Sequence, residues 1–118
     1  MKIRTICFDI DNVICKTGNK NNYSKSKPIK KNIEVINKIY DKGFKVILYT
    51  ARYMGRCDGK VTKVKKMIKP LTLRQLKKWG VKYNKLIFGK PSFDLIIDDK
   101  SISFKSNWHD DLKKKIRI

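Results

Sequence analysis

Acidic residues, histidine and arginine are scarce in this sequence. Ten Asp and Glu residues stand against thirty Lys and Arg residues, so the formal net charge is +20. With His109 as the sole histidine, a His/Cys zinc cluster is not expected. Arginine occupies only positions 4, 52, 56, 74 and 117, whereas nucleic-acid contacts favour Arg forks and interleaved aromatic side chains. We therefore interpret the positive charge first as the result of a lysine-rich composition, which gives the protein a general preference for anionic ligands. Nucleic-acid binding stays possible but is not favoured.

Long apolar runs and paired cysteines are also missing. No stretch reaches the roughly 20 apolar residues that span a bilayer, and the apolar start from Ile3 to Ile14 is interrupted by Asp9 and Asp11. Neither a membrane partner nor a signal peptide is expected. The three cysteines lack CxxC spacing, which suits a reducing cytoplasm better than a disulfide framework.

Apolar runs and turn signals alternate in an order that predicts an α/β fold. The 118 residues are expected to form one domain, 1–118. Strands separated by helices predict a mainly parallel sheet in a Rossmann-like three-layer sandwich. Segments 12–29 and 51–69 are interpreted as flap or active-site loops, too short for a separate cap domain. The predicted strands are 3–9, 44–49, 85–88 and 94–97, and the predicted helices are 28–42, 71–79 (after Pro70) and 107–118.

Polar residues follow each of the four predicted strands. Any one of them has an ordinary structural explanation, such as a helix cap, a turn former or a surface lysine. Their joint order is harder to dismiss, because parallel α/β sheets bind ligands at the carboxyl ends of their strands. The residues expected to converge at this rim are Asp9 and Asp11, Thr50 and Arg52, Lys90, and Asp98 with Asp99.

Phosphoryl transfer explains why these residue types would be needed together. A carboxylate approaches a phosphate dianion against charge repulsion, so a cation must neutralise both. Asp9 is the predicted nucleophile, forming an aspartyl-phosphate. Asp11 is the predicted general acid/base, free to swing between the leaving group and water. Thr50 and Lys90 are predicted to bind the phosphate oxygens, where transition-state charge gathers.

The predicted cofactor is Mg²⁺, which takes hard oxygen ligands. The predicted ligands of the ion are Asp9, a main-chain carbonyl near Asp11, and Asp98 or Asp99. Arg52 is predicted to grip a second anionic group of the substrate with its guanidinium fork. The alternative for Arg52 is a solvent-facing side chain.

Four motifs resemble those of the haloacid dehalogenase superfamily. FDIDNV resembles the hydrophobic-DxDx(T/V) first motif, VILYT the second, and GKP and IIDD the third-motif lysine and fourth-motif acidic pair. The two aspartates of the first motif resemble those found in the phosphatase branch of this superfamily. TARYMGR, WGVKYNKLIFGKP and IIDDKSI together resemble the small capless capsule- or polysaccharide-biosynthesis phosphatases. Asn12 departs from the usual glycine, but Asn tolerates turn conformations.

The resemblance implies a core fold of this superfamily and supports the roles given above to the nucleophile, acid/base, phosphate binders and metal ligands. The expected function is a cytoplasmic, Mg²⁺-dependent phosphatase that acts on a small-molecule phosphate ester, such as a sugar phosphate or glycan precursor. Two alternatives stay open: a nucleotide or polynucleotide-end phosphatase, and a non-catalytic nucleic-acid-binding module on the same fold. A site without a cap needs a bulky substrate or a neighbouring subunit as its lid, so a homo-oligomer is expected.

Overall fold

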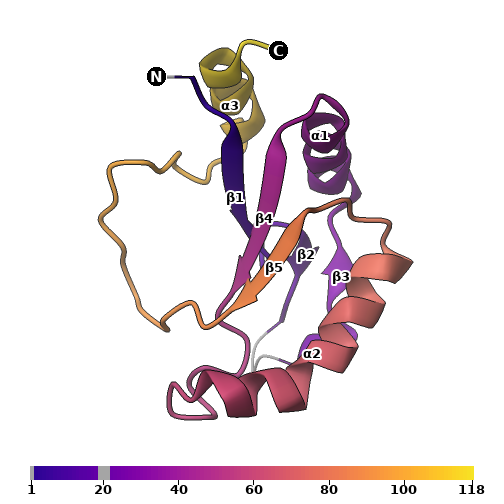
Figure 1. Cartoon of the computed structure of the whole chain (residues 1–118), viewed down its shortest axis with the longest axis vertical. Coiled ribbons are helices and arrows are strands. Elements are labelled where there is room, and N and C mark those ends of the chain that lie inside the picture. Colours follow the sequence, from indigo (N-terminus) through magenta and orange to yellow (C-terminus); the bar gives the residue numbers. More distant parts are fainter. Residues whose placement is uncertain (1, 19–21) are drawn as a thin grey trace.

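A three-stranded parallel sheet forms the centre of the protein (Figure 1). The computed structural model describes residues 2–18 and 22–118. In the register of the sheet, Phe8 lies beside Leu48, and Thr50 lies beside Phe88. The strands run in one direction, so their carboxyl ends share one edge. In spatial order they are β1 (Thr5–Asp9), β4 (Lys45–Thr50) and β5 (Lys85–Phe88).

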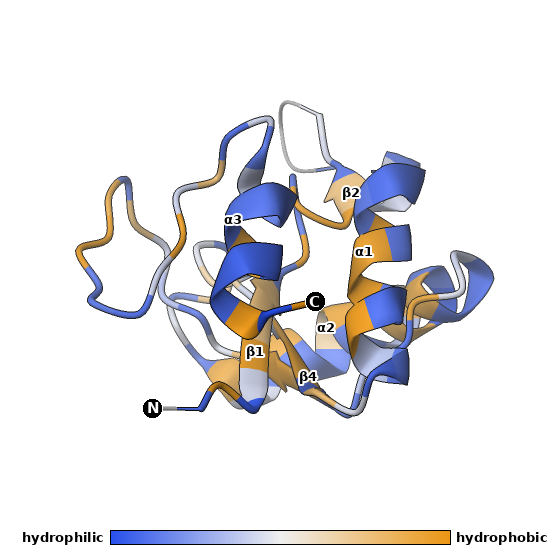
Figure 2. Ribbon diagram, turned by 90° about the horizontal axis from the view of Figure 1, so that it is seen from above, coloured by the Kyte–Doolittle hydropathy of each residue, from blue (hydrophilic) through white to orange (hydrophobic). Residues whose placement is uncertain are grey.

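The three α-helices supply apolar side chains to one face of this sheet. Phe8, Val46 and Leu48 are buried in a common cluster with residues of all three helices, and the Phe8 ring meets Trp108 edge-on at 6.1 Å. Seen from above, α1 and α3 lie on the same side of β1 and β4 (Figure 2). The opposite face, which includes Cys7 and Ile47, is exposed or half-buried. The helices are α1 (Lys30–Asp41), α2 (Val61–Lys78) and α3 (Trp108–Ile116).

This arrangement confirms the predicted α/β class and is consistent with a small Rossmann-like fold. In the described residues, all three helices contribute to the cluster on one face of the sheet. None of the helices in the described ranges is both long enough and apolar enough to cross a membrane.

A short hairpin occupies the first of the two predicted loops. Strand β2 (Cys15–Lys16) pairs antiparallel with β3 (Lys27–Pro28), and a 3-10 turn, η2 (Tyr23–Lys25), lies between them. Residues 19–21, inside the predicted flap 12–29, lie outside the described residues. The hairpin follows β1 directly, so it holds the chain close to the carboxyl edge of the sheet.

Helix α2 begins ten residues earlier than the sequence predicts. The prediction started it after Pro70, because proline fits the first turn of a helix. In the structure Pro70 is inside the helix. The buried positions Val64, Ile68, Thr72 and Leu76 recur every four residues, and burial of this face outweighs the cost of an interior proline. The predicted active-site loop 51–69 is therefore a turn followed by the first half of α2.

The predicted strand at 94–97 is absent from the structure. These residues form no backbone hydrogen bond with another described segment, so no sheet ladder includes them, and residues 91–101 are all exposed. In Figure 1 the connection between β5 and α3 swings out beyond β1. Its large apolar side chains are exposed, with Leu95 at 83% and Ile97 at 95%. The prediction followed the apolar run Leu95–Ile97, but an apolar run becomes a strand only where a partner strand pairs with it.

Candidate active site at the carboxyl edge of the sheet

Asp9, Thr50 and Lys90 come together at the carboxyl edge. The Lys90 ammonium lies 3.3 Å from Asp9 Oδ2, and the Lys90 backbone N–H donates to the Thr50 carbonyl at 3.1 Å. This last bond extends the β4–β5 ladder by one residue and holds Lys90 at the rim. Thr50 itself is fully buried, and its hydroxyl accepts a hydrogen bond from the Arg52 N–H at 3.1 Å. Three residues predicted from separate motifs therefore share one site.

Gly89 makes the approach of Lys90 to Asp9 geometrically possible. Its φ is +101°, a conformation that side chains with a Cβ rarely adopt. A Cβ at this position would also lie 3.0 Å from the Val61 side chain. Gly89 lies between the end of β5 and Lys90, and Val61 at the start of α2 lies against it. The glycine of the GKP motif is thus required by backbone conformation and by space.

The electrostatic environment of Asp9 is set by burial and by one cation. Burial raises the pKa of the Asp9 carboxyl above its ordinary value, while the Lys90 charge and the N–H of Ile10 act in the lowering direction. That N–H donates to Oδ1 at 2.8 Å. The Asp9 side chain remains 35% exposed, so an incoming ligand can reach it. A carboxylate whose pKa is perturbed by burial and by a specific charge partner is a candidate functional group.

Asp11 is held in place by Arg52, contrary to the predicted freedom to swing. Arg52 Nε donates to Asp11 Oδ2 at 3.0 Å, and Nη2 donates to Oδ1 at 3.0 Å. The hydroxyl of Thr17 donates to the same Oδ1 at 2.6 Å. The Asp11 side chain is 19% exposed and that of Arg52 is fully buried. Oδ2 keeps the greater free acceptor capacity of the two carboxylate oxygens.

Arg52 is anchored from its far side by α2. Its Nη1 donates to Gln75 Oε1 at 2.6 Å and to Thr72 Oγ1 at 3.1 Å, and its guanidinium lies 4.8 Å from the Tyr23 ring centroid. All three guanidinium nitrogens thus have protein partners. The predicted substrate-binding role of Arg52 stays a prediction, and this geometry gives the residue a different task, which is to orient Asp11.

Sequence reasoning missed the partners of Arg52. Thr72 and Gln75 lie three residues apart and belong to the buried face of α2. Polar residues at two positions of an otherwise apolar helical stripe were the available signal, since buried polar groups need partners. Both residues lie inside the predicted helix 71–79, but nothing in the local sequence links them to Arg52, which is twenty or more residues away.

The hairpin supports Asp11 through a left-handed residue and two hydroxyls. Asn12 has a φ of 68°, and its Oδ1 accepts from the Thr17 N–H at 3.3 Å. Thr17 Oγ1 also lies 2.8 Å from the Ser26 hydroxyl of the returning segment. Asn12 therefore adopts the turn conformation expected of the residue after the DxD pattern, and the hairpin is tied to the carboxylate it flanks.

The acidic pair Asp98 and Asp99 is not gathered at this edge. Both residues lie in the exposed 91–101 segment, where Asp98 Oδ1 accepts from the Lys100 N–H at 2.8 Å in a local turn. Within residues 2–18 and 22–118 no group of three His, Cys, Asp or Glu side chains is arranged to hold a metal ion. The predicted metal-binding role of Asp98 and Asp99 stays a prediction, and the structure brings only Asp9 and Asp11 together.

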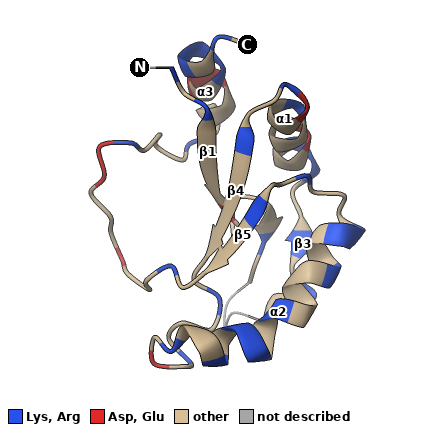
Figure 3. Cartoon of the chain, viewed as in Figure 1, with Lys and Arg blue, Asp and Glu red and all other residues tan. Residues whose placement is uncertain are grey.

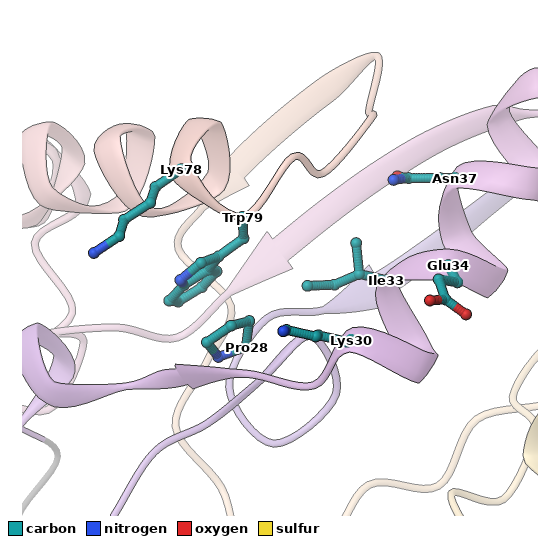
Figure 4. A pocket seen from close by; sticks show the side chains of 7 residues that line it. All are labelled: Pro28, Lys30, Ile33, Glu34, Asn37, Lys78 and Trp79. Carbon is teal, nitrogen blue, oxygen red and sulfur yellow. The ribbon is translucent and has the colours of Figure 1, made fainter.

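A separate hollow of about 460 Å³ lies between α1 and the end of α2 (Figure 4). Trp79, Pro28 and Ile33 face one another across it. None of its lining residues belongs to the Asp9–Lys90 site. Glu34 is its only acidic side chain, and it has no cysteine, histidine or hydroxyl nucleophile. The candidate chemistry therefore remains at the strand ends.

The fold and site define a small parallel α/β protein with an aspartate–lysine pair at its strand ends. No family model and no curated protein matches the sequence. Among solved structures, an MCSG target protein from Vibrio cholerae is similar with a TM-score of 0.79 and 24% identity, over 96% of this chain and 98% of that one. Two structures of the Pnkp1/Rnl/Hen1 RNA repair complex contain chains with TM-scores of 0.53 and 0.55, each at 17% identity.

These likenesses establish the fold alone. The match to the two RNA repair chains covers 96% and 98% of this chain but only 31% and 34% of theirs, so this protein corresponds to about a third of each. The Vibrio cholerae protein is matched over nearly its whole length, which shows that the same fold occurs in another chain of similar extent.

Proposed function

We propose that this protein is a Mg²⁺-dependent phosphomonoester hydrolase of the haloacid dehalogenase superfamily, with Asp9 as its nucleophile. The observation that carries the proposal is the Lys90 ammonium 3.3 Å from Asp9 Oδ2, at the end of a parallel strand. The motifs that carry the resemblance supply the residues of this pair. On that resemblance, the first substrates to test are sugar phosphates and glycan precursors.

Asp9 would attack phosphorus in line and form an aspartyl-phosphate as the bond to the leaving oxygen breaks. Lys90 neutralises part of the charge that gathers on the phosphate oxygens. Asp11 would donate a proton to the leaving oxygen in the first step. In the second step it would accept a proton, through Oδ2, from the water that attacks phosphorus, as the Asp9–phosphorus bond breaks and releases inorganic phosphate and the Asp9 carboxylate. Arg52 and Thr17 keep that carboxylate oriented in both steps.

The donor chemistry at the edge fits a weakly held Mg²⁺. The ion commonly takes one or two protein carboxylates and completes its shell with water and substrate phosphate. The Asp9 carboxylate and the main-chain carbonyl of Asp11 would hold it, since the Asp11 carboxylate is engaged by Arg52. When bound, the ion would offset the repulsion between Asp9 and the phosphate dianion. Asp98 and Asp99 stay part of the proposal as additional ligands.

The proposal also includes the cellular setting and assembly expected from the sequence. Cys7, Cys15 and Cys57 are free thiols, which supports a reducing cytoplasm. The Asp9 side chain is 35% exposed, and an open site of this kind supports a bulky substrate or a lid borrowed from a second copy.

The test is hydrolysis of p-nitrophenyl phosphate by the wild type and by Asp9→Asn, Lys90→Ala and Asp41→Asn, each with Mg²⁺ and with EDTA. Asp41 is an exposed control carboxylate that pairs with Lys82, away from the strand ends. We expect metal-dependent turnover in the wild type and in Asp41→Asn, and none in Asp9→Asn. Equal turnover by Asp9→Asn and the control would reject Asp9 as the nucleophile. No turnover of this reporter or of a panel of sugar phosphates and nucleotides would reject the enzyme assignment.

A further inference from the structure

The positive charge of this protein is unevenly distributed. Residues 59–93 contain eleven Lys and Arg residues and no Asp or Glu. Figure 3 shows the result: blue segments follow one another along α2 without a red one, whereas α1 and α3 carry both colours. A general lysine-rich composition would spread acidic residues across this third of the chain too. The asymmetry indicates a local cause.

Helix α2 carries a stripe of basic residues at helical spacing. Lys63, Lys66, Arg74 and Lys77 are separated by three, eight and three residues, which places them within one face of the helix. All four are exposed. None of the basic residues of α2 forms a salt bridge within the described part of the chain. At 1.5 Å per residue the stripe is about 20 Å long.

The basic residues of α2 oppose the helix dipole at its start, and those of α3 do not. α3 has Asp110 and Asp111 in its first turn and lysines in its last turn, the arrangement that stabilises a helix. α2 has no acidic residue in its first turn, and its N-cap is Lys60 without a side-chain cap bond. The lysines of α3 are thus explained by helix stability. The lysines near the start of α2 are not, and a bound anion would relieve their repulsion.

α2 also begins beside the candidate active site and adjoins an aromatic cluster. Val61, its first residue, packs against Gly89, the neighbour of Lys90. The Tyr23 and Tyr53 rings lie 5.7 Å apart, and the Arg56 guanidinium lies 4.3 Å from the Tyr53 ring centroid. Tyr53 has a φ of 63°, which is unusual for an aromatic residue. The two rings pack with Val64 and Ile68 on the buried face of α2, while the basic stripe lies on its exposed face. Aromatic rings and cations are among the groups that bind single-stranded nucleic acid.

We infer that the exposed basic face of α2 binds single-stranded nucleic acid, so that a terminal phosphate of the strand reaches the Asp9–Lys90 site. The binding part stands on the charge, spacing and aromatic cluster alone. The substrate assignment rests on the proposed phosphatase function and deepens it, because it replaces a sugar phosphate by a polynucleotide end. An anionic membrane surface would use the same charges but has no need of the tyrosine–arginine pair.

The test is binding of a fluorescent single-stranded oligouridylate, measured by anisotropy as a function of salt. The wild type is compared with a stripe variant (Lys63→Gln, Lys66→Gln, Arg74→Gln, Lys77→Gln). The control variant carries four equivalent changes on and near α3 (Lys105→Gln, Lys113→Gln, Lys114→Gln, Lys115→Gln), so both variants have a net charge of +16. At about 0.7 counterions per phosphate contact on a single strand, loss of four contacts lowers the salt slope by about 3.

The inference holds if the stripe variant loses the salt-dependent binding and the control keeps it. Equal weakening of both variants would mean that only total charge matters, and would overturn it. The inference is also overturned if the wild type does not bind the oligouridylate, or if it binds only to phosphatidylserine vesicles measured in parallel. p-Nitrophenyl phosphate turnover, which the stripe variant should retain, is scored separately. If the wild type shows no turnover, the proposed phosphatase function is rejected, and the binding result still stands.

Discussion

Arg52 binds Asp11 through two guanidinium nitrogens while the third nitrogen is anchored on α2. The relationship links the segment after β1 to the second half of α2 through a side chain that is itself fully buried. Arg52 therefore transmits the position of a helix to the carboxylate proposed as acid/base. This arrangement assigns Arg52 a positioning role, with consequences that differ from those of a substrate ligand.

Arg52→Lys should lower kcat with little change in KM. Lysine keeps the charge but lacks the planar fork, so it cannot hold Asp11 and reach Gln75 at once. We expect kcat to fall at least about tenfold, as for other losses of orientation. A substrate ligand would instead raise KM. Steady-state kinetics with p-nitrophenyl phosphate separate the two, and a raised KM at constant kcat would contradict the positioning role.

Substitutions of the two aspartates of the first motif should affect the free energy of unfolding differently. Burial raises the pKa of Asp9, so at neutral pH its ionised form costs folding free energy, and Asp9→Asn should keep or raise the free energy of unfolding. Asp11→Ala removes the carboxylate that pairs with buried Arg52 and should destabilise by about 3 kcal/mol or more. Urea unfolding at pH 7 measures both. A larger loss in Asp9→Asn than in Asp11→Ala would refute the assigned environments.

The pH dependence of activity should reflect the environment of Asp9. The raised pKa means that the nucleophile becomes protonated as the pH falls through a value above the ordinary 3.8. Activity is thus present above that value and lost below it. Lys90 is the largest cause acting in the lowering direction, so in Lys90→Ala the acid limb should move further upward. The residual kcat/KM of this variant, followed against pH, checks the sign, and a downward move would contradict it.

Gly89→Ala should be destabilising and should impair turnover. The substitution places a Cβ at a φ of +101° and 3.0 Å from Val61, and left-handed backbone alone costs about 1–2 kcal/mol for a residue with a Cβ. Gly55→Ala is the matched control, because nothing lies within 4 Å of its Cβ position. Thermal unfolding should show a clear loss for Gly89→Ala and almost none for Gly55→Ala. Adding Val61→Ala should recover the part due to the close contact.

The sequence was sufficient to predict the first half of the site. Asp9 and Lys90 each follow an apolar run that becomes a parallel strand, and parallel strands bring their carboxyl ends together whatever the loops do. The two residues therefore meet as expected. The fork on Asp11 could not be predicted in the same way, because Arg52 and its partners on α2 are twenty or more residues apart and no local period links them.

The errors came from patterns that need a tertiary partner. Leu95–Ile97 has the composition of a buried strand, but composition does not say whether a neighbouring strand is available, and in the structure none pairs with it. Pro70 favours a helix start locally, yet the buried stripe through Ile68 and Leu76 carries the helix across it. In both places long-range packing, or its absence, decides the outcome.

The exposed connection between β5 and α3 has a consequence for the colloidal behaviour of the protein. Leu95, Ile96 and Ile97 are open to solvent, and in the described residues β1 is hydrogen-bonded to a strand on one side only. An apolar extended segment near an unpaired strand edge favours pairing between copies. The charge of +20 opposes such contacts over the Debye length, about 30 Å at 0.01 M salt and 8 Å at 0.15 M. The protein should therefore stay dispersed in dilute buffer and self-associate as salt is added.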